Sequence, residues 1–321
     1  MPNASPSVEL PTFDDVLAAA RRIASRVYRT PVLTSQSLDE ELGASLFFKC
    51  ENFQRTGAFK FRGASNAVWS LEDDTAARGV VTHSSGNHGA ALARAAQERG
   101  IRARVVMPRG SSTVKRRAVE AFGGEVVECE PSQQSREEAT ASLLEASGGV
   151  LVHPYDDGAV IAGQGTCSLE LVQRVADLDL VVAPIGGGGL LSGTALVARR
   201  MAPQAEVVGA EPAGADDAWR SFEAGEIVPV RSPRTMADGL RATIGVRPFA
   251  ILRQGGVRIV RVSEEAIRAA LRLAYERLKV VIEPSAAVAI AALTGGELHL
   301  AGKRVGVILS GGNVTLPEDW P

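Results

Sequence analysis

The chain has 321 residues, of which 45% are hydrophobic and 22% are charged, and its formal net charge at pH 7 is −2. This balance is typical of a globular protein with a large core, and it gives no reason to expect a nucleic-acid or membrane partner. The apolar runs are too short to span a bilayer, and Cys50, Cys129 and Cys167 are too isolated to form a metal cluster or a disulfide framework. We therefore expect a cytoplasmic protein without a signal peptide.

Helical and strand-like segments alternate along most of the chain. A helix is predicted after Thr12, a strand at 46–50 and a helix at 62–71. Further strands are predicted at 80–82, 103–107, 124–128, 149–153, 178–185, 205–211, 257–262 and 303–310, with helices between most of them. Short strands rich in Val, Ile and Leu that alternate with helices are typical of parallel sheets covered on both faces. We predict an α/β protein whose ligands bind beyond the carboxyl ends of its strands.

A run of glycines follows one of these strands in the segment IGGGGLLSG (185–193). Successive glycines at the start of a helix expose backbone N–H groups, which together can bind an anion such as phosphate. A tight turn is the alternative interpretation, and the spacing is not the GxGxxG of dinucleotide-binding proteins. The residues of this candidate phosphate site are Gly186, Gly187, Gly188, Gly189 and Leu190.

A polar loop joins a strand to a helix in the segment THSSGNHG (82–89). Ser84, Ser85, Asn87 and His88 offer hydroxyl, amide and imidazole groups next to the N–H groups of a helix start, which suits a carboxylate ligand. Capping of that helix by Ser84 or Ser85 is the alternative.

Two further segments supply candidate groups for a cofactor. Lys60 lies between Phe59 and Phe61, and burial there would lower the pKa of its amine toward the neutral form that Schiff-base chemistry needs. On its own such a lysine would more readily be a surface residue. Ser310, at a strand end in VILSGGN (307–313), suits a hydrogen bond to a ring nitrogen or a simple turn.

The segment GAEPAGADDA (209–218) suggests a cation site. The carboxylates of Glu211 and Asp217, with the backbone carbonyl of Ala215, would supply the oxygen ligands that Mg²⁺ and Ca²⁺ prefer. Alternatively, Asp216 and Asp217 cap the helix that follows.

In combination, the motifs GAFKFRGA, THSSGNHG, VIAGQGT, GGGG, AEP, ADG, IEPSAA and LSGGN resemble the fold type II pyridoxal-phosphate enzymes. The resemblance is strongest to serine racemases and short serine/threonine dehydratases, and it runs from residue 30 to residue 314. It implies two open, twisted parallel-sheet domains of the tryptophan-synthase-β type with pyridoxal phosphate between them. The large domain would comprise residues 1–72 and 157–321, and the small domain residues 73–156. A homodimer is also expected.

The resemblance assigns a role to each candidate residue. Lys60 would hold the cofactor as a Schiff base and remove the Cα proton of the substrate, with Ser85 on the opposite face. The other cofactor contacts would be Phe59, Asn87, the residues Gly186, Gly187, Gly188, Gly189 and Leu190, and Ser310. The substrate carboxylate would bind to Ser84, Ser85, Asn87 and His88. Glu211, Ala215 and Asp217 resemble the divalent-cation site of the family.

The expected reaction is β-elimination of water from L-threonine or L-serine, which gives a 2-oxo acid and ammonia. Serine racemisation is the nearest alternative, since Lys60 and Ser85 would flank Cα, but Tyr155 and Asp156 resemble the dehydratase loop more closely. Elimination from 3-hydroxyaspartate would need a cation for the second carboxylate, for which Arg136 is the candidate. Phenylserine also remains open as a substrate. A non-catalytic amino-acid sensor would not need the Schiff-base lysine.

Overall fold

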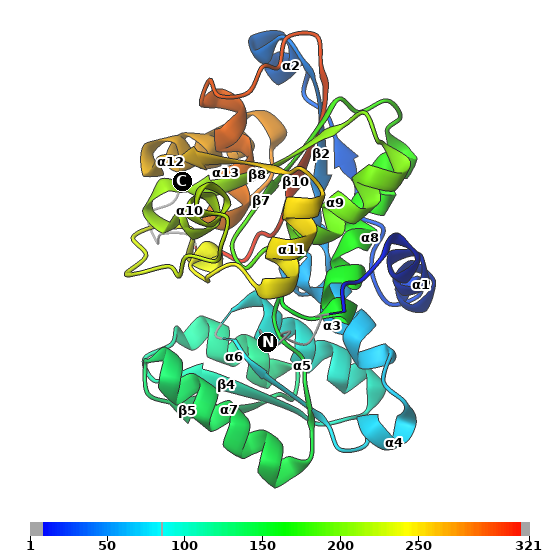
Figure 1. Ribbon diagram of the computed structural model, residues 1–321, viewed down its shortest axis with the longest axis vertical. Coiled ribbons are helices and arrows are strands. Elements are labelled where there is room, and N and C mark those ends of the chain that lie inside the picture. Colours follow the sequence, from blue (N-terminus) through cyan, green and yellow to red (C-terminus); the bar gives the residue numbers. More distant parts are fainter. Residues whose placement is uncertain (1–8, 85, 316–321) are drawn as a thin grey trace, which may run out of the picture.

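The computed structural model of the chain describes residues 9–84 and 86–315. Within these residues the strands form a six-stranded sheet and a four-stranded sheet, both flanked by helices (Figure 1). The order of the larger sheet is β1-β2-β10-β7-β8-β9, and that of the smaller sheet is β5-β4-β3-β6. β1 is antiparallel to β2, and the other strand pairs are parallel. The α/β architecture with two parallel sheets that the sequence predicts is therefore confirmed.

The strands of the larger sheet are β1 (Val32–Leu33), β2 (Ser45–Cys50), β7 (Leu180–Pro184), β8 (Glu206–Pro212), β9 (Arg258–Val262) and β10 (Arg304–Leu309). Those of the smaller sheet are β3 (Val80–His83), β4 (Ala103–Pro108), β5 (Glu125–Cys129) and β6 (Val150–Leu151). Each sheet takes its strands from one of the two predicted domains, while the exact domain boundaries stay a prediction.

The α-helices are α1 (Phe13–Ile23), α2 (Gln36–Leu42), α3 (Lys60–Trp69), α4 (Asp73–Ala76), α5 (Asn87–Arg99), α6 (Thr113–Ala121), α7 (Gln133–Ser147), α8 (Gly158–Arg174), α9 (Gly189–Met201), α10 (Asp217–Ala224), α11 (Val246–Gln254), α12 (Glu264–Leu273) and α13 (Pro284–Thr294). Short 3₁₀ turns occur at η1 (Glu51–Phe53), η2 (Arg55–Gly57), η3 (Ala213–Ala215) and η4 (Asp238–Leu240), and a π-helical turn at η5 (Ala274–Leu278).

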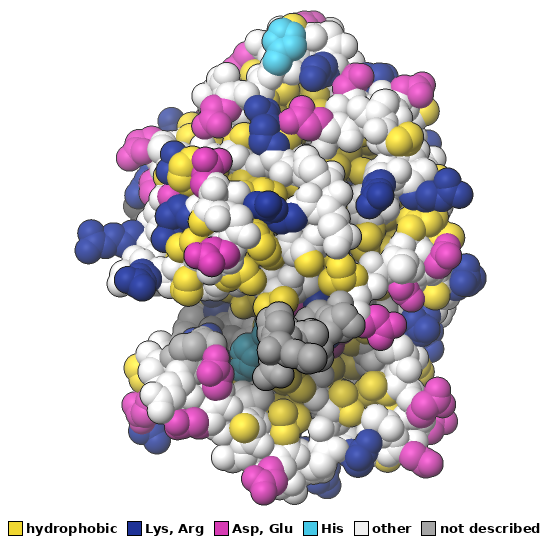
Figure 2. Space-filling view, in the orientation of Figure 1, with side chains coloured by type: hydrophobic (Ala, Val, Ile, Leu, Met, Phe, Trp, Pro, Cys, Tyr) yellow, Lys and Arg dark blue, Asp and Glu magenta, His cyan; other side chains and the backbone are white. Residues whose placement is uncertain are grey.

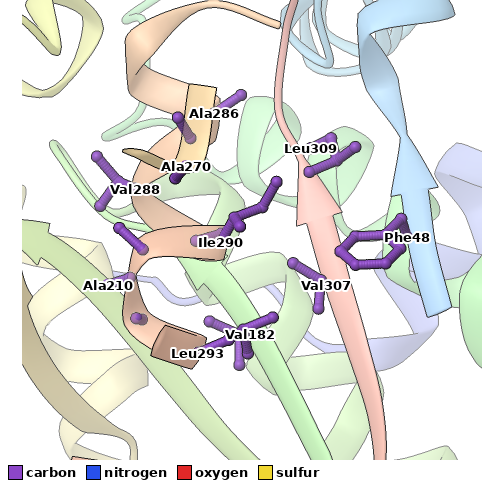
Figure 3. Packing of buried hydrophobic residues seen from close by; sticks show 14 of the residues in the cluster. Phe48, Val182, Ala210, Ala270, Ala286, Val288, Ile290, Leu293, Val307 and Leu309 are labelled. Carbon is purple, nitrogen blue, oxygen red and sulfur yellow. The ribbon is translucent and has the colours of Figure 1, made fainter. Parts of the chain in front are cut away.

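The largest core lies between the larger sheet and α13, a helix that is apolar on nearly all sides. Figure 3 shows Ile290 and Leu293 of this helix beside Val182 of β7, and Phe48 of β2 beside Val307 of β10. Full burial of one such side chain stabilises a fold by about 1.5–3 kcal/mol. α9 covers the opposite face of the same sheet, so the central strands are buried on both sides. This double burial explains why they are continuous apolar runs.

Local sequence sets where several helices begin and end. Thr12 and Asp15 form a reciprocal capping box at the start of α1, and Asp157 caps α8 by accepting a hydrogen bond from its first turn. Gly100 and Gly148 end α5 and α7 in the left-handed backbone conformation, which glycine adopts without steric cost.

The strand directions bring the predicted motifs together. β2, β10, β7 and β8 are parallel neighbours, so the loops that follow them leave the same edge of the larger sheet. The loops after β7 and β10 carry the glycines at 186–188 and Ser310, while Lys60 begins α3 after the turns that follow β2 and Glu211 lies at the carboxyl end of β8. In the smaller sheet, β3 ends at His83, directly before the polar loop.

The surface drawn in Figure 2 mixes side chains of both charge signs, in keeping with the small net charge of −2. Among the residues that the structure describes, we find no helix with the length and apolar character needed to cross a membrane.

Candidate active site

The loops that carry Lys60 and Ser310 are joined through their backbones. The N–H of Phe59 donates to the carbonyl of Ser310 at 3.0 Å, and the N–H of Gly312 donates to the carbonyl of Gly57 at 2.9 Å. An isolated antiparallel bridge pairs Ala58 with Gly311. Two motifs that are about 250 residues apart in the sequence are therefore held side by side by backbone hydrogen bonds.

Lys60 is the first residue of α3, and its side chain is half-buried. Its Nζ donates a hydrogen bond to the carbonyl of Pro154 at 2.7 Å. Burial lowers the pKa of this amine to about 8, although the negative charge of Glu283 acts in the opposite direction. A lysine with such a pKa is partly neutral near physiological pH, as a nucleophilic amine requires.

The glycine loop is closely packed and buried. Gly188 has a φ of 90°, which favours glycine, and it precedes the first turn of α9. A Cβ atom on Gly187 would lie 2.3 Å from the ring of Tyr155, and one on Gly186 would lie 2.9 Å from the Cα of Leu240. Side chains are therefore excluded from the loop, and the first N–H groups of α9 have no acceptor within their own helix. This is the geometry of an anion cradle.

The polar loop contributes groups from the smaller sheet. Asn87 is the first residue of α5, and Ser84 accepts a hydrogen bond through its Oγ from the N–H of Gly86 at 3.3 Å. The Nε2 of His88 lies 3.2 Å from the carbonyl oxygen of Val152. Burial, and secondarily the charge of Lys60, holds the pKa of His88 well below its usual value, so its imidazole is neutral. Ser85 lies outside the described residues.

Two imidazoles and a phenol form a ring cluster beside Lys60. The ring centres of His83 and His153 are 4.9 Å apart, and those of His153 and Tyr155 are 4.6 Å apart, with edge-to-face contacts in both pairs. Burial lowers the pKa of His153 to about 4 and raises that of Tyr155 to about 12. Burial, followed by the charge of Arg136, also lowers the pKa of His83. The cluster is therefore neutral, with Arg136 close enough to act on it electrostatically.

Arg136 carries a buried donor. Its Nε is removed from solvent and has no hydrogen-bond partner among the groups that the structure describes. Burying an unsatisfied donor is costly, more so on a charged group, and an anion at this position would remove that cost.

The cation motif lies behind the glycine loop. Glu211 lies in β8, and its carboxylate accepts hydrogen bonds from the N–H groups of Ala218 and Trp219 in α10 at 2.9 and 2.8 Å. Asp217 accepts one from the N–H of Ile244 at 2.8 Å, while its other oxygen is buried without a partner among the described groups. Helix capping thus comes from Glu211, whereas Asp216, at the N-cap position, makes no capping hydrogen bond.

Both carboxyl groups have a raised pKa. Burial is the main cause and brings the pKa of Glu211 to about 8 and that of Asp217 to about 6, with the charges of neighbouring aspartates adding to each. No group of three or more His, Cys, Asp or Glu side chains suited to a metal occurs in the described part of the chain, so a cation here would depend on the carbonyl of Ala215.

A family model described as pyridoxal-phosphate dependent enzyme matches residues 23–311 of the chain. The chain belongs to this family. The beta-hydroxyaspartate dehydratase of Paracoccus denitrificans (strain Pd 1222) is 51% identical over 309 residues, which cover 96% of this chain and 98% of that protein. The serine racemase of Dictyostelium discoideum is 45% identical over 310 residues, which cover 95% of each.

Solved structures agree with this assignment. Maize serine racemase superposes with a TM-score of 0.93 at 43% identity, over 96% of this chain and 95% of that one. The processed form of threonine deaminase isoform 2 from Solanum lycopersicum superposes with a TM-score of 0.86 at 31% identity, over 98% of this chain and 91% of that one. The chain therefore has the fold of the fold type II pyridoxal-phosphate enzymes, as the motifs predict, and its family includes both dehydratases and racemases.

The site has the chemical groups that pyridoxal phosphate needs. The glycine loop offers a phosphate cradle that any side chain would fill, and Lys60 offers an amine with a lowered pKa. Ser310 is buried directly beside Phe59. Sequence reasoning missed two groups: the carbonyl of Pro154 and the carboxylate of Glu283. Glu283 belongs to the IEPSAA motif, where a carboxylate next to a helix-starting proline in an apolar segment was the available signal.

Proposed function

We propose that the protein is a pyridoxal-phosphate dependent ammonia-lyase that removes water from a small β-hydroxy amino acid and forms a 2-oxo acid and ammonia. The observation that carries this proposal is the position of Lys60. Its amine, with a pKa of about 8, donates to the carbonyl of Pro154, the residue before the tyrosine that packs on the glycine loop. The residue before Lys60 is bonded through its N–H to the Ser310 loop.

In this proposal the cofactor lies between the large and small domains. The N–H groups of residues 186–190 would hold its phosphate, Asn87 would contact its 3-oxygen, Ser310 would pair with its ring nitrogen and Phe59 would pack against its ring. When bound, pyridoxal phosphate supplies the electron sink for the Cα carbanion. Lys60 attaches it and takes the Cα proton, a role for which a partly neutral amine is suited.

The substrate carboxylate is assigned to the polar loop. Ser84, Asn87 and His88 lie at the N-terminus of α5, where backbone N–H groups and the helix dipole favour an anion. Ser85 is assigned to the same carboxylate by the resemblance alone. His88, being neutral, can serve only as a hydrogen-bonding group there and adds no charge.

For the substrate itself, we infer that 3-hydroxyaspartate fits better than L-serine or L-threonine. The buried, unpartnered Nε of Arg136 provides a donor for a second carboxylate, and the 51% identical relative bears the name beta-hydroxyaspartate dehydratase. Small hydroxy amino acids would leave this donor unsatisfied. L-Serine and L-threonine remain the alternative substrates for elimination.

Serine racemisation is the second candidate function. The 45% identical relative and the maize structure are both serine racemases, and Lys60 with Ser85 would provide the two opposed groups that racemisation needs. Tyr155 and Asp156, which resemble the dehydratase loop, favour elimination.

The test is a substrate panel of L- and D-serine, L-threonine, 3-hydroxyaspartate and phenylserine, with measurement of 2-oxo acid formation and enantiomer exchange. We expect the highest kcat/KM for elimination from 3-hydroxyaspartate. Arg136→Gln should raise its KM about tenfold or more, because a charge-assisted hydrogen bond is lost, and should change the KM for L-serine less than about twofold.

The matched control is Arg109→Gln, which removes an exposed arginine of the smaller-sheet region and should leave both KM values unchanged. If enantiomer exchange of serine is faster than its elimination, the protein is a serine racemase and the ammonia-lyase proposal fails. Equal effects of Arg136→Gln on both substrates would remove 3-hydroxyaspartate as the preferred one. Loading of the cofactor without turnover of any substrate would favour a sensor.

We also propose a divalent-cation site, Mg²⁺ or Ca²⁺, at Glu211, Asp217 and the carbonyl of Ala215. The buried, unpartnered oxygen of Asp217 supports it, because a cation would satisfy that oxygen and offset the clustered negative charge.

A homodimer is likewise proposed. Phe53, Val281 and Val314 are 49%, 41% and 37% exposed, and their segments meet where the Nδ2 of Asn52 donates to the carbonyl of Val281 at 3.2 Å. Neighbouring exposed apolar side chains favour a protein interface. Sedimentation velocity at micromolar concentration should give twice the 33.7 kDa chain mass. Phe53→Asp should shift the protein toward the monomer.

A further inference from the structure

Glu283 makes a polar contact between the two halves of the molecule. It precedes α13, which packs on the larger sheet, and it is 6% exposed. Both oxygens of its carboxylate accept from the Nδ2 of Asn87, at 2.9 and 3.0 Å. Asn87 begins α5, which packs on the smaller sheet. The two residues are 196 positions apart in the sequence.

The amide of Asn87 is held at both ends. While its nitrogen faces Glu283, its Oδ1 accepts from the Nδ2 of Asn313 at 3.0 Å. Asn313 is itself fixed, because its Nδ2 also donates to the carbonyl of Thr56 at 2.7 Å. A flipped amide would place an oxygen against the carboxylate of Glu283 and a nitrogen against a nitrogen donor. The contacts therefore select one orientation of Asn87.

Helix capping does not explain Glu283. It occupies the N-cap position of α13, yet its side chain makes no capping hydrogen bond to that helix, whose first residue is Pro284. Its N–H donates to the carbonyl of Gly311 at 3.0 Å, which ties it to the Ser310 loop. The carboxylate is instead directed to Asn87.

The charges around Glu283 come from both halves of the molecule. Burial raises its pKa to about 7, the charge of Asp238 adds to this, and Asn87 and Lys115 act in the opposite direction. Glu283 in turn opposes the lowering of the Lys60 pKa by burial. Near pH 8 the carboxyl is mainly ionised, so it provides a negative charge that acts on the amine of Lys60.

We propose that Glu283 is a positioning residue of the cofactor site: it fixes the amide of Asn87 across the two domains, and from that fixed position its negative charge acts on Lys60. This role rests on the proposed function, in which Asn87 contacts the cofactor and Lys60 attaches it. It adds a residue to which neither the motifs nor the resemblance assigned a task.

The test uses Glu283→Gln and Glu283→Asp in the full chain, freed of cofactor and titrated with pyridoxal 5′-phosphate, with attachment followed by visible absorption. We expect the affinity of Glu283→Gln for the cofactor to fall about tenfold, because a glutamine amide cannot accept at both positions. The rate of attachment should rise with the neutral fraction of Lys60. The pH at which the attachment rate is half its maximum, the pH midpoint, should be near 8 in the unaltered protein. It should move to lower pH in Glu283→Gln, because the negative charge that raises the pKa of Lys60 is gone.

Glu283→Asp keeps the charge but shortens the reach to Asn87, so it should lose affinity and keep the pH midpoint near that of the unaltered protein. Glu264→Gln is the matched control, since it removes a half-buried carboxylate that contacts the N–H of Met236 away from this site. It should change neither readout.

An unchanged affinity in Glu283→Gln would overturn the role, as would a lower affinity with an unshifted midpoint. The role would also be overturned if Glu283→Gln lost enough thermal stability to account for its whole loss of cofactor affinity. These outcomes are separate from failure of the proposed function, which would show as no cofactor attachment by the unaltered protein or as no turnover of the substrate panel.

Discussion

Arg62 lies two residues after Lys60 and anchors the start of α3 in a buried ionic cluster. Its Nε is 2.7 Å from the Oε2 of Glu51, and its Nη1 is 2.7 Å from the Oε1 of Glu170. Lys49 contacts the other oxygen of Glu170 at 2.6 Å. Arg62 and Glu51 are fully buried, so each depends on the other for its charge to be tolerated. The position of Lys60 is thereby tied to the sheet.

Arg62→Met should reduce the free energy of unfolding by about 3–5 kcal/mol, because it leaves the carboxylate of Glu51 buried without its cation. Urea unfolding followed by circular dichroism measures this change. The double variant Glu51→Gln with Arg62→Met should recover part of the loss, because the uncompensated charge is gone. Equal losses in the single and double variants would contradict this account.

The same pair predicts a pH dependence. Burial alone would raise the pKa of Glu51, but the charge and hydrogen bonds of Arg62 outweigh it, and the net shift is downward. A carboxyl with a lowered folded-state pKa contributes stability above its unfolded-state pKa and loses it as pH falls. Stability from this pair should therefore be complete at neutral pH and decline below about pH 4.5. In Arg62→Met that part of the acid dependence should be absent.

At the scale of elements, the buried strands and long helices could be predicted because their apolar patterns are local. Short elements could not be predicted when their stabilising contacts come from elsewhere. α11 contains Pro248, and its first N–H groups, those of Val246 and Arg247, donate to Asp156, about 90 residues earlier. A helix was expected where α10 lies, but its cap comes from Glu211 of β8 and not from the neighbouring aspartates. β1 is only two residues long and depends on its pairing with β2.

The glycine loop and the Tyr155 loop form one packed unit, so a methyl group should disrupt it. Gly187→Ala places a Cβ 2.3 Å from the ring of Tyr155, and the loop or the ring must move. Such overpacking costs about 1–3 kcal/mol, so we expect cofactor affinity to fall about tenfold. Fluorescence titration with pyridoxal 5′-phosphate measures it.

Gly295→Ala is the matched control, because its φ is −78° and the nearest atom to an added Cβ lies 3.5 Å away. It should bind the cofactor normally. Adding Tyr155→Ala to Gly187→Ala should restore part of the affinity. If the double variant binds no better than Gly187→Ala, contact with the ring is not the cause.

At the scale of the whole molecule, the site depends on contacts that join distant parts of the chain. Each loop could be predicted separately, since loops after parallel strands gather at one edge. The contacts between the loops could not, because Lys60 reaches Pro154 across 94 positions and Asn87 reaches Glu283 across 196. No periodicity or spacing encodes such pairs. For the same reason, Glu283 was visible in the sequence only as part of a motif.

The proposed cation site would act on the stability of the whole molecule. The carboxylate of Asp217 accepts a hydrogen bond from Ile244, and Ile244 lies against Gly188. A cation bound to Asp217 would therefore stabilise the position of the glycine loop. A ligand present at 100 times its Kd stabilises the folded state by about 2.7 kcal/mol. Saturating Mg²⁺ should therefore raise the Tm by several degrees, and a chelator should reverse the rise.

Asp217→Asn should abolish this response, because it removes a carboxylate ligand. Asp216→Asn is the matched control: Asp216 is paired with Arg220 and Arg261, so its loss should leave the response to Mg²⁺ intact. Differential scanning calorimetry with and without Mg²⁺ compares the three proteins. An equal rise in Tm for Asp217→Asn would place the cation elsewhere, and no rise in the unaltered protein, with Ca²⁺ also without effect, would remove the site. If only Asp217→Asn loses the rise in Tm, the cation binds at Asp217. Because Asp217 contacts Ile244, and Ile244 lies against Gly188, cation binding would then be connected to the loop proposed to hold the cofactor phosphate.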